Sequence, residues 1–160
     1  MLNRKITMER FEMGAELLDE ALEGVGEEQL DLSAAPGEWS IRTILHHLAD
    51  DGDVWEMIAK KAAVNPGVQI HMEGFAENEV WAQALGFDRR AVGADLALFR
   101  AHRAALTALA EDLPEVWDNP VEIVTADGAG RFTVTFGRVL EILSEHLDEH
   151  ILTIRAILKN

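Results

Sequence analysis

Two histidines near the end of the chain, His146 and His150, are four residues apart. On a helix this spacing places both imidazoles on one face, about one 5.4 Å turn apart. The same face carries Leu143 and Ile154, so the pattern predicts that both imidazoles point into an apolar core. Burying their nitrogens without partners is costly, and a metal ion would bind both at about 2.0 to 2.1 Å. The pair therefore indicates two ligands of a metal site that needs a third ligand from elsewhere.

A third ligand is available in an earlier segment, where His46 and His47 are adjacent. Neighbouring side chains on a helix differ in direction by about 100°, so only one of these two can face inward. His46 lies nearly opposite the apolar stripe through Leu48 and Trp55, and we expect it to be solvated. His47 lies on the shoulder of that stripe and is predicted to be the third ligand. Either histidine signal alone is more typical of packing, whereas the two together favour a metal site.

Asp51 follows His47 by one helical turn and is the candidate for completing the site. It could bind the ion directly, or it could accept a hydrogen bond from an imidazole N–H and leave a coordination position open. A third alternative is a solvated carboxylate at the end of a helix bundle. We favour the hydrogen-bonded position, because a carboxylate ligand would lower the net charge of the ion and close the site. The surrounding acidic run, residues 50–53, lacks the spacing and the final Glu of a calcium-binding loop.

Structural roles are expected for the other histidines and for the four tryptophans. His102 lies off the apolar stripe of its helix and is predicted to be a boundary residue, not a fourth ligand. His71 falls in a segment of weak periodicity, where nothing supports a functional role. An indole buries a large apolar area and needs one acceptor, so all four tryptophans are expected in the core or at an interface. Trp39, which precedes the helix of His47, is also a candidate wall of the metal site.

Four amphipathic helices must position these side chains. In each of them apolar residues recur at helical spacing, and segments that contain Pro and Gly separate the helices. Ser40 and Thr135 are predicted to cap the second and the fourth helix, which carry the histidines. The helices are predicted at about residues 3–22, 41–63 and 90–112, and from residue 136 nearly to the end of the chain.

The connections between these helices are long. Residues 68–87 are predicted to be irregular, with one short helix at Glu77–Ala84 that carries Trp81. Two β-type runs, Val121–Thr125 and Arg131–Val134, flank a Gly-containing turn and predict a hairpin. The sequence thus predicts an all-α fold, a four-helix bundle with long crossover loops and a small β-hairpin before the last helix, in a single domain over residues 1–160.

Composition excludes several classes of protein. The chain has 14 Lys and Arg against 29 Asp and Glu, a formal charge of −15, so nucleic acid and anionic membrane surfaces are not expected partners. It has no Cys, which excludes disulfides, thiolate ligands and a cysteine nucleophile. No apolar run is long enough for a signal peptide or a membrane span, and we expect a cytoplasmic protein.

These motifs together resemble the DinB-like superfamily of metal-binding four-helix-bundle proteins, which includes the YfiT-like group. The resemblance implies an antiparallel bundle in which three histidines hold a single divalent ion. Similar proteins are metal-dependent transferases or isomerases that join low-molecular-weight thiols to electrophiles, and some are described as hydrolases. The matching features are Trp39-Ser40-Ile41-Arg42 leading to His47, and Thr135 opening a last helix with His146 and His150.

We therefore expect a metal-dependent enzyme that activates water or a low-molecular-weight thiol at a three-His site, as a hydrolase or a thiol S-transferase. One divalent transition metal ion per chain, zinc or nickel, is the expected cofactor, and a small molecule is the expected substrate. The chain has no basic cluster at which an anionic thiol would dock, which weakens the thiol alternative. The other alternative is a non-catalytic, metal-stabilised module for small-molecule binding or stress response. Bundles of this length with four Trp also favour a homodimer.

Overall fold

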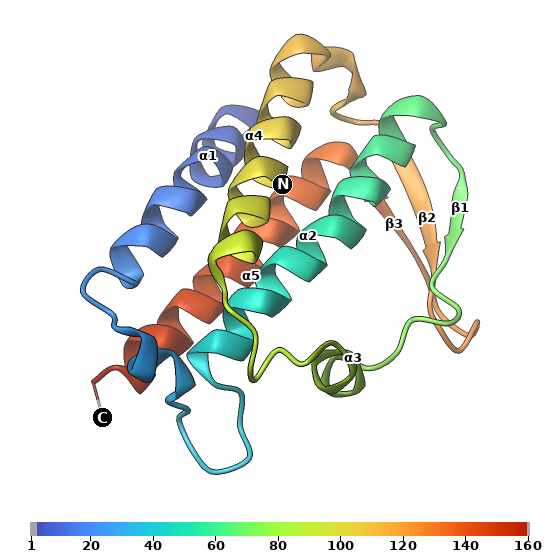
Figure 1. Cartoon of the computed structure of the whole chain (residues 1–160). Helices are drawn as coiled ribbons and strands as arrows, with labels where there is room; N and C mark the ends of the chain where they lie inside the picture. Colours follow the sequence, from blue (N-terminus) through green and yellow to red (C-terminus); the bar gives the residue numbers. More distant parts are fainter. Residues whose placement is uncertain (1–2, 160) are drawn as a thin grey trace.

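Four long helices and a small sheet make up the structure, a computed structural model that describes residues 3–159 (Figure 1). The long helices lie within a few residues of their predicted positions. They are α1 (Arg4–Ala21), α2 (Ile41–Val64), α4 (Gly93–Asp112) and α5 (Phe136–Ile157). The shorter elements are the helix α3 (Asn78–Leu85), the 3-10 turns η1 (Glu27–Asp31) and η2 (Pro114–Val116), and the strands β1 (Gln69–His71), β2 (Pro120–Val124) and β3 (Arg131–Thr135).

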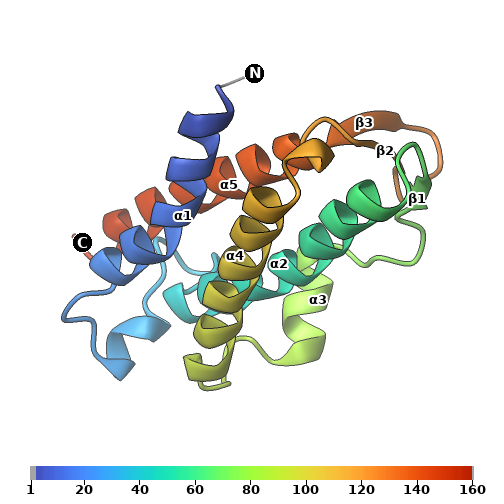
Figure 2. The ribbon, with the colours of Figure 1, turned by 90° about the horizontal axis from the view of Figure 1, so that it is seen from above.

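The bundle is antiparallel only in part. Helix α2 packs between α4 and α5, and α1 packs between the same two helices on the opposite side. Following the chain colours in Figures 1 and 2, α2 and α4 run in one direction, while α1 and α5 run in the other. Each long helix therefore has one parallel and one antiparallel neighbour, which corrects the expected all-antiparallel arrangement. Two parallel neighbours need a long connection, and between α2 and α4 this connection contains β1 and α3.

The two helices that carry the histidines begin as predicted. The Ser40 side chain accepts a hydrogen bond from the backbone N–H of Thr43, and Thr135 accepts one from Arg138, so each fills an N-cap. The first nine residues of α2, Ile41–Ala49, are all buried. This all-round burial arises because α4, α5 and η1 surround that half of the helix. The first half of α2 is therefore buried on all of its faces, not along a single apolar stripe.

A three-stranded sheet closes one end of the bundle, with β1 parallel to β2 and β2 antiparallel to β3. The predicted hairpin is confirmed, whereas β1 lies in the segment that was expected to be irregular. Three residues are too few to show a period, and β1 is held by its pairing with β2, some fifty residues away, as in Gln69 against Glu122. Within residues 3–159, no helix combines the length and the apolar character needed to cross a membrane.

Two clusters of buried apolar side chains form the core. One lies toward the sheet and the other toward η1, so the bundle is packed along its length. The sheet-end cluster includes Phe11, Ile58, Leu106, Val121, Phe136 and Leu140, and the cluster at the other end includes Leu18, Leu30, Ile44, Phe99, Leu147 and Ile154.

Candidate metal centre

Three imidazoles meet where α2 packs against α5. His47 comes from the second turn of α2, while His146 and His150 come from successive turns of α5. The Nε2 atom of His146 lies 3.2 Å from Nε2 of His47 and 2.9 Å from Nε2 of His150. Ligand atoms of the three residues all lie within 4.8 Å of one another. The structure thus brings together the three side chains that were predicted as metal ligands.

The spacing of these nitrogens fits a shared ion. Two ligands at about 2.0 to 2.1 Å from one ion, separated by an angle of about 90° to 110°, lie about 2.9 to 3.4 Å apart. Both of the Nε2 separations fall in that range. Three imidazole nitrogens are a donor set suited to zinc, nickel and other divalent transition metals. The residues present therefore fit a divalent metal ion.

Two of the imidazoles, those of His47 and His150, are kept in the neutral form that a metal ligand needs. Burial lowers the pKa of His47 to about 3, and the neighbouring His146 and His150 add to the effect. Burial and His146 likewise lower the pKa of His150 to about 4. At neutral pH both rings therefore lack the extra proton, and no charge has to be displaced before a cation binds.

Asp51 contacts His146 across the helix interface. Its Oδ2 lies 3.2 Å from Nδ1 of His146, on the side of the ring away from the other two imidazoles. A carboxylate at Nδ1 favours the tautomer in which Nδ1 carries the proton, so the Nε2 lone pair faces the centre. Burial raises the pKa of Asp51, with His146 and a hydrogen bond from Trp55 acting in the opposite direction. Asp51 thus lies outside the group of three nitrogens, beside His146, whereas the sequence placed it near His47.

Trp39 covers the imidazoles from the chain segment before α2. Its ring centroid lies 4.8 Å from that of His47 in an edge-on arrangement, and 6.5 Å from that of His150 in a nearly parallel one. The indole excludes water from one side of the cluster and restricts the rotation of both rings. Trp39 therefore lies where the sequence analysis placed it, against the site as a wall.

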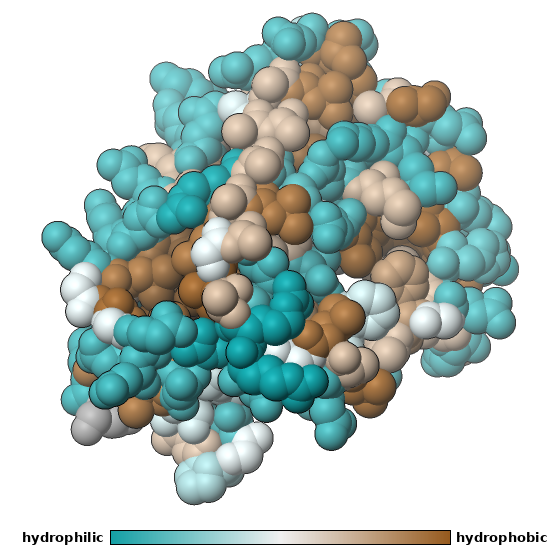
Figure 3. All heavy atoms as spheres, in the orientation of Figure 1, coloured by the Kyte–Doolittle hydropathy of each residue, from teal (hydrophilic) through white to brown (hydrophobic). Residues whose placement is uncertain are grey.

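A cavity of about 220 Å³ adjoins the cluster on its other side. It lies between α2 and the segment that runs from β1 to α3. Figure 3 shows that brown apolar patches lie among teal hydrophilic ones on this face of the molecule. The Trp81 indole N–H donates to the Asp50 carboxylate and so ties α3 to α2, and Phe75 stacks on Trp81 with ring centroids 6.4 Å apart. The lining is aromatic, apolar and acidic, comprising His47, Asp50, Asp51, Val54, Trp55, Met72, Phe75, Ala76, Asn78 and Trp81.

The cavity wall was missed by the sequence analysis. Trp55 and Trp81 were expected to be core or interface residues, and Phe75 and Met72 were given no role. Their segment has weak periodicity, so no pattern tied it to α2 before the tertiary structure was known. The signal available in the sequence was a pair of aromatic residues, Phe75 and Trp81, in a stretch otherwise too polar to form a core.

The DinB superfamily model matches residues 10–154, which is most of the chain. The chain belongs to the DinB superfamily. Among solved structures it is similar to YfiT from Bacillus subtilis, described as a probable metal-dependent hydrolase with an unusual four-helix bundle topology. The TM-score is 0.81 at 20% sequence identity, over 98% of this chain and 86% of YfiT, so the likeness shows a shared fold. No curated protein matches the chain.

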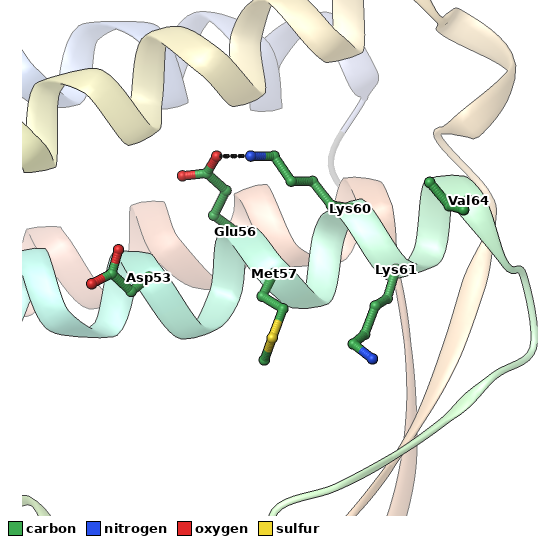
Figure 4. A pocket seen from close by; sticks show the side chains of 6 residues that line it. All are labelled: Asp53, Glu56, Met57, Lys60, Lys61 and Val64. Atoms are coloured by element: carbon green, nitrogen blue, oxygen red, sulfur yellow. Dashed lines mark ion pairs between the residues drawn. The ribbon is translucent and has the colours of Figure 1, made fainter.

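A larger hollow on this DinB-superfamily bundle lies elsewhere. It has about 490 Å³ and contains no histidine. All of its lining residues, Asp53 to Val64, come from α2 alone, and Figure 4 shows them projecting from different sides of that one helix. Glu56 and Lys60 pair with each other across one turn. A hollow formed by a single helix is an open surface, so the cavity beside the histidines is the better candidate for a substrate site.

His46 is buried, which corrects the expectation that it is solvated. Only 1% of its surface is exposed, because α4 and the loop before it cover this side of α2. Nδ1 pairs with the Asp95 carboxylate, Nε2 lies 3.1 Å from the Arg90 carbonyl oxygen, and Phe87 stacks on the ring. The helical-wheel argument assumed one apolar stripe, whereas this half of α2 is buried all round. Both nitrogens of His46 are satisfied by protein groups, so it is no candidate ligand.

His102 and His71 also lie apart from the cluster. His102 is buried, with 8% of its surface exposed, which corrects the expectation of a boundary residue. Its Nε2 lies 2.9 Å from Asp53 and 3.4 Å from Glu56, so this side chain joins α4 to α2. His71 is exposed on β1 and does not line the cavity. Neither residue is brought into the metal centre, as the sequence analysis expected.

Proposed function

We propose that this protein is a metal-dependent hydrolase of a small molecule, with His47, His146 and His150 holding one divalent ion. The observation that carries the proposal is the convergence of three imidazole nitrogens beside a cavity of about 220 Å³. A purely structural metal site would need no such space. The description of YfiT as a probable metal-dependent hydrolase supports the same reaction class.

The three imidazole ligands determine the charge of the ion and therefore the chemistry that it would supply. An ion held by three neutral imidazoles keeps its positive charge and an open coordination position, and can lower the pKa of a bound water to about 7. The Asp51 carboxylate, 3.2 Å from Nδ1 of His146, favours the tautomer with the proton on Nδ1 and so leaves Nε2 free to bind the ion. Trp39 keeps water from one side, so the substrate reaches the ion from the cavity lined by Trp55 and Trp81.

Water is the favoured nucleophile over a low-molecular-weight thiol. The thiols used by similar proteins are anionic, and the cavity offers them carboxylates: Asp50 and Asp51 are among its lining residues. Lysine and arginine are absent from the lining within residues 3–159. Zinc and nickel are the proposed ions because both accept imidazole ligands at neutral pH.

The test begins with the metal content of purified protein, measured by mass spectrometry, and with turnover of a panel of esters, amides and lactones. We expect about one ion per chain and hydrolysis that a chelator abolishes and zinc or nickel restores. His150→Gln should lose both metal and hydrolysis. His71→Gln, which removes an exposed histidine outside the cluster, should keep both. Metal binding without any hydrolysis would instead support the non-catalytic binding module.

We also propose that the protein assembles as a homodimer through its helix faces. Each chain carries a formal charge of −15, so two chains repel each other through solvent at low ionic strength. Raising the salt concentration should therefore strengthen the dimer, whereas it would weaken an interface built on ion pairs. Sedimentation at low and high salt measures this, and a monomer under both conditions would contradict the proposal.

A further inference from the structure

The charged side chains that line the cavity beside the histidines are all acidic. Two of its lining residues are carboxylates, Asp50 and Asp51, and Asn78 is the other polar residue besides His47. No Lys or Arg side chain of the described residues 3–159 lines it. Asp51 faces His146, whereas Asp50 is bound only to the Trp81 indole N–H, which leaves its negative charge without a cationic partner. The cavity therefore presents one uncompensated carboxylate next to an aromatic wall.

The nearest cation does not change this balance. Arg90 acts on Asp50 through space, but it also pairs with Asp95 at 3.4 Å. Asp53 and Asp95 are themselves close enough to raise the pKa of Asp50, in addition to the larger effect of its burial. The four carboxylates Asp50, Asp51, Asp53 and Asp95 thus outweigh Arg90 and a divalent ion at the histidines taken together, in a chain with a formal charge of −15. A cation entering the cavity would be attracted both by this local field and by the charge of the whole molecule.

The aromatic lining favours the same ligand. Trp55, Trp81 and Phe75 line the cavity, and the Phe75 ring stacks on Trp81 at a centroid distance of 6.4 Å. Indole and phenyl faces attract organic cations, most strongly where water is excluded. Met72 and Val54 add apolar surface for an uncharged part of the ligand. Carboxylate, aromatic faces and apolar surface together form a recognition surface for an ammonium group carried on an apolar body.

We propose that the substrate of this site is a small organic cation, an ammonium compound with an apolar or aromatic body, whose charged group lies against Asp50 while its reacting group faces the three histidines. This inference rests on the proposed hydrolase function and adds the class of substrate. Anionic substrates are disfavoured by the same carboxylates. The preference depends on Asp50 and the aromatic wall.

Three probes with the same benzyl body and a tetrahedral head group test the charge preference. They are benzyltrimethylammonium, benzyl methyl sulfone and phenylmethanesulfonate, which are positive, neutral and negative. The quaternary ammonium group cannot bind a metal, so any preference for it comes from the protein. Calorimetric titration of the full chain, as purified and after loading with zinc, measures each dissociation constant. We expect the cation to bind about tenfold more tightly than the sulfone, and the sulfonate to bind most weakly.

Asp50→Asn is the decisive variant, because Asn keeps an acceptor for the Trp81 N–H and removes only the charge. It should weaken binding of the ammonium probe about fivefold to tenfold and leave the sulfone within about twofold. Asp112→Asn, at the exposed end of α4 and outside the cavity, removes the same charge from the molecule and should change neither.

Two results would overturn the inference. One is equal binding of the three probes, and the other is an equal effect of Asp50→Asn and Asp112→Asn. The measurement reads binding and not turnover, so its outcome is separate from that of the hydrolase test. Metal-dependent hydrolysis without a charge preference would refute the substrate class alone, whereas a charge preference in a protein that binds no metal would refute the hydrolase alone.

Discussion

His46 and His47 are neighbours in the chain, both buried in α2, and their surroundings differ. The His46 ring faces α4, where Asp95 and the Arg90 carbonyl oxygen satisfy its two nitrogens. The His47 ring faces α5, where its Nε2 meets an imidazole nitrogen of His146 at 3.2 Å. The carboxylate and the carbonyl oxygen can accept the N–H hydrogen bonds of His46, so this ring needs no further partner. The nitrogens of His47, His146 and His150 lie close to one another, and a cation can bind all three. Both histidines are buried, so it is the groups around each ring that distinguish a structural histidine from a candidate metal ligand.

The same distinction extends to the carboxylates on the two sides of α2. Asp95 pairs with His46 and with Arg90, so its charge serves to join the loop before α4 to α2. Asp51 pairs with His146 through Nδ1, the nitrogen that points away from the cluster. Loss of Asp95 should therefore affect the fold, and loss of Asp51 should affect the metal centre. The comparison of the two sides can be tested with matched substitutions.

The largest effect is expected from His47→Gln compared with His46→Gln. His47→Gln removes one of three ligands and should weaken metal binding by more than about a hundredfold. This is more than the loss of about tenfold to a hundredfold that is typical when a residue hydrogen-bonded to a ligand is replaced. His46→Gln should keep one metal ion per chain but lower the free energy of unfolding by about 1 to 3 kcal/mol, because the half-buried Asp95 loses one of its two partners. Metal titration and chemical denaturation measure the two quantities. Equal loss of metal in both variants would refute the assignment of His47.

The next effect is expected from the pair Asp51→Asn and Asp95→Asn. Asp51→Asn should weaken metal binding about tenfold to a hundredfold, because the His146 ring loses the carboxylate that orients it. Asp95→Asn should leave metal affinity within about twofold and reduce stability instead. Wild-type metal affinity in Asp51→Asn would remove this residue from the site, and a complete loss would identify it as a direct ligand.

A smaller effect is expected from pH. The pKa of His47 is about 3 and that of His150 about 4 in the folded chain, against 6.5 for an ordinary histidine. Below pH 6.5 the unfolded chain therefore binds protons that the folded chain does not, and the free energy of unfolding falls as the pH is lowered. Each ring contributes at most about 1.4 kcal/mol per pH unit between pH 6.5 and its folded pKa.

Denaturation of the metal-free protein at pH 7, 6 and 5 measures this slope. His47→Gln should make the profile less steep, whereas His71→Gln, which alters an exposed histidine, should leave it unchanged. A wild-type profile that stays flat from pH 7 to 5 would show that the cluster does not resist protonation.

The sequence predicted the parts of the molecule that depend on local periodicity. The four long helices, the caps Ser40 and Thr135, and the hairpin follow from local patterns, and the inward direction of His47, His146 and His150 follows from spacing along one helix at a time. What it missed depends on contacts between distant segments. The strand β1 exists through its pairing with β2, and the burial of His46 requires α4 to pack on a face of α2 that was expected to meet solvent.

The partner of Asp51 illustrates the same limit. Its position one turn after His47 indicated a neighbour on its own helix, yet the imidazole that it contacts belongs to His146 on α5. A helical wheel gives the direction in which a side chain leaves its helix but not the residue opposite it. The hydrogen bond from Trp81 to Asp50 could not be predicted for the same reason, since α3 and α2 meet only in the folded chain.

The chain segment that returns from the end of α2 to the start of α4 also encodes much of the wall opposite the imidazoles. Met72, Phe75 and Trp81 lie on this return segment, whereas the three histidines lie on α2 and α5. Asp50 and Trp55 of α2 supply the rest of the cavity lining that the proposed preference depends on. Substitutions at Met72, Phe75 and Trp81 would therefore change the cavity while the helices that carry the histidines keep their sequence, which makes this connection the natural place for redesigning what the cavity accepts.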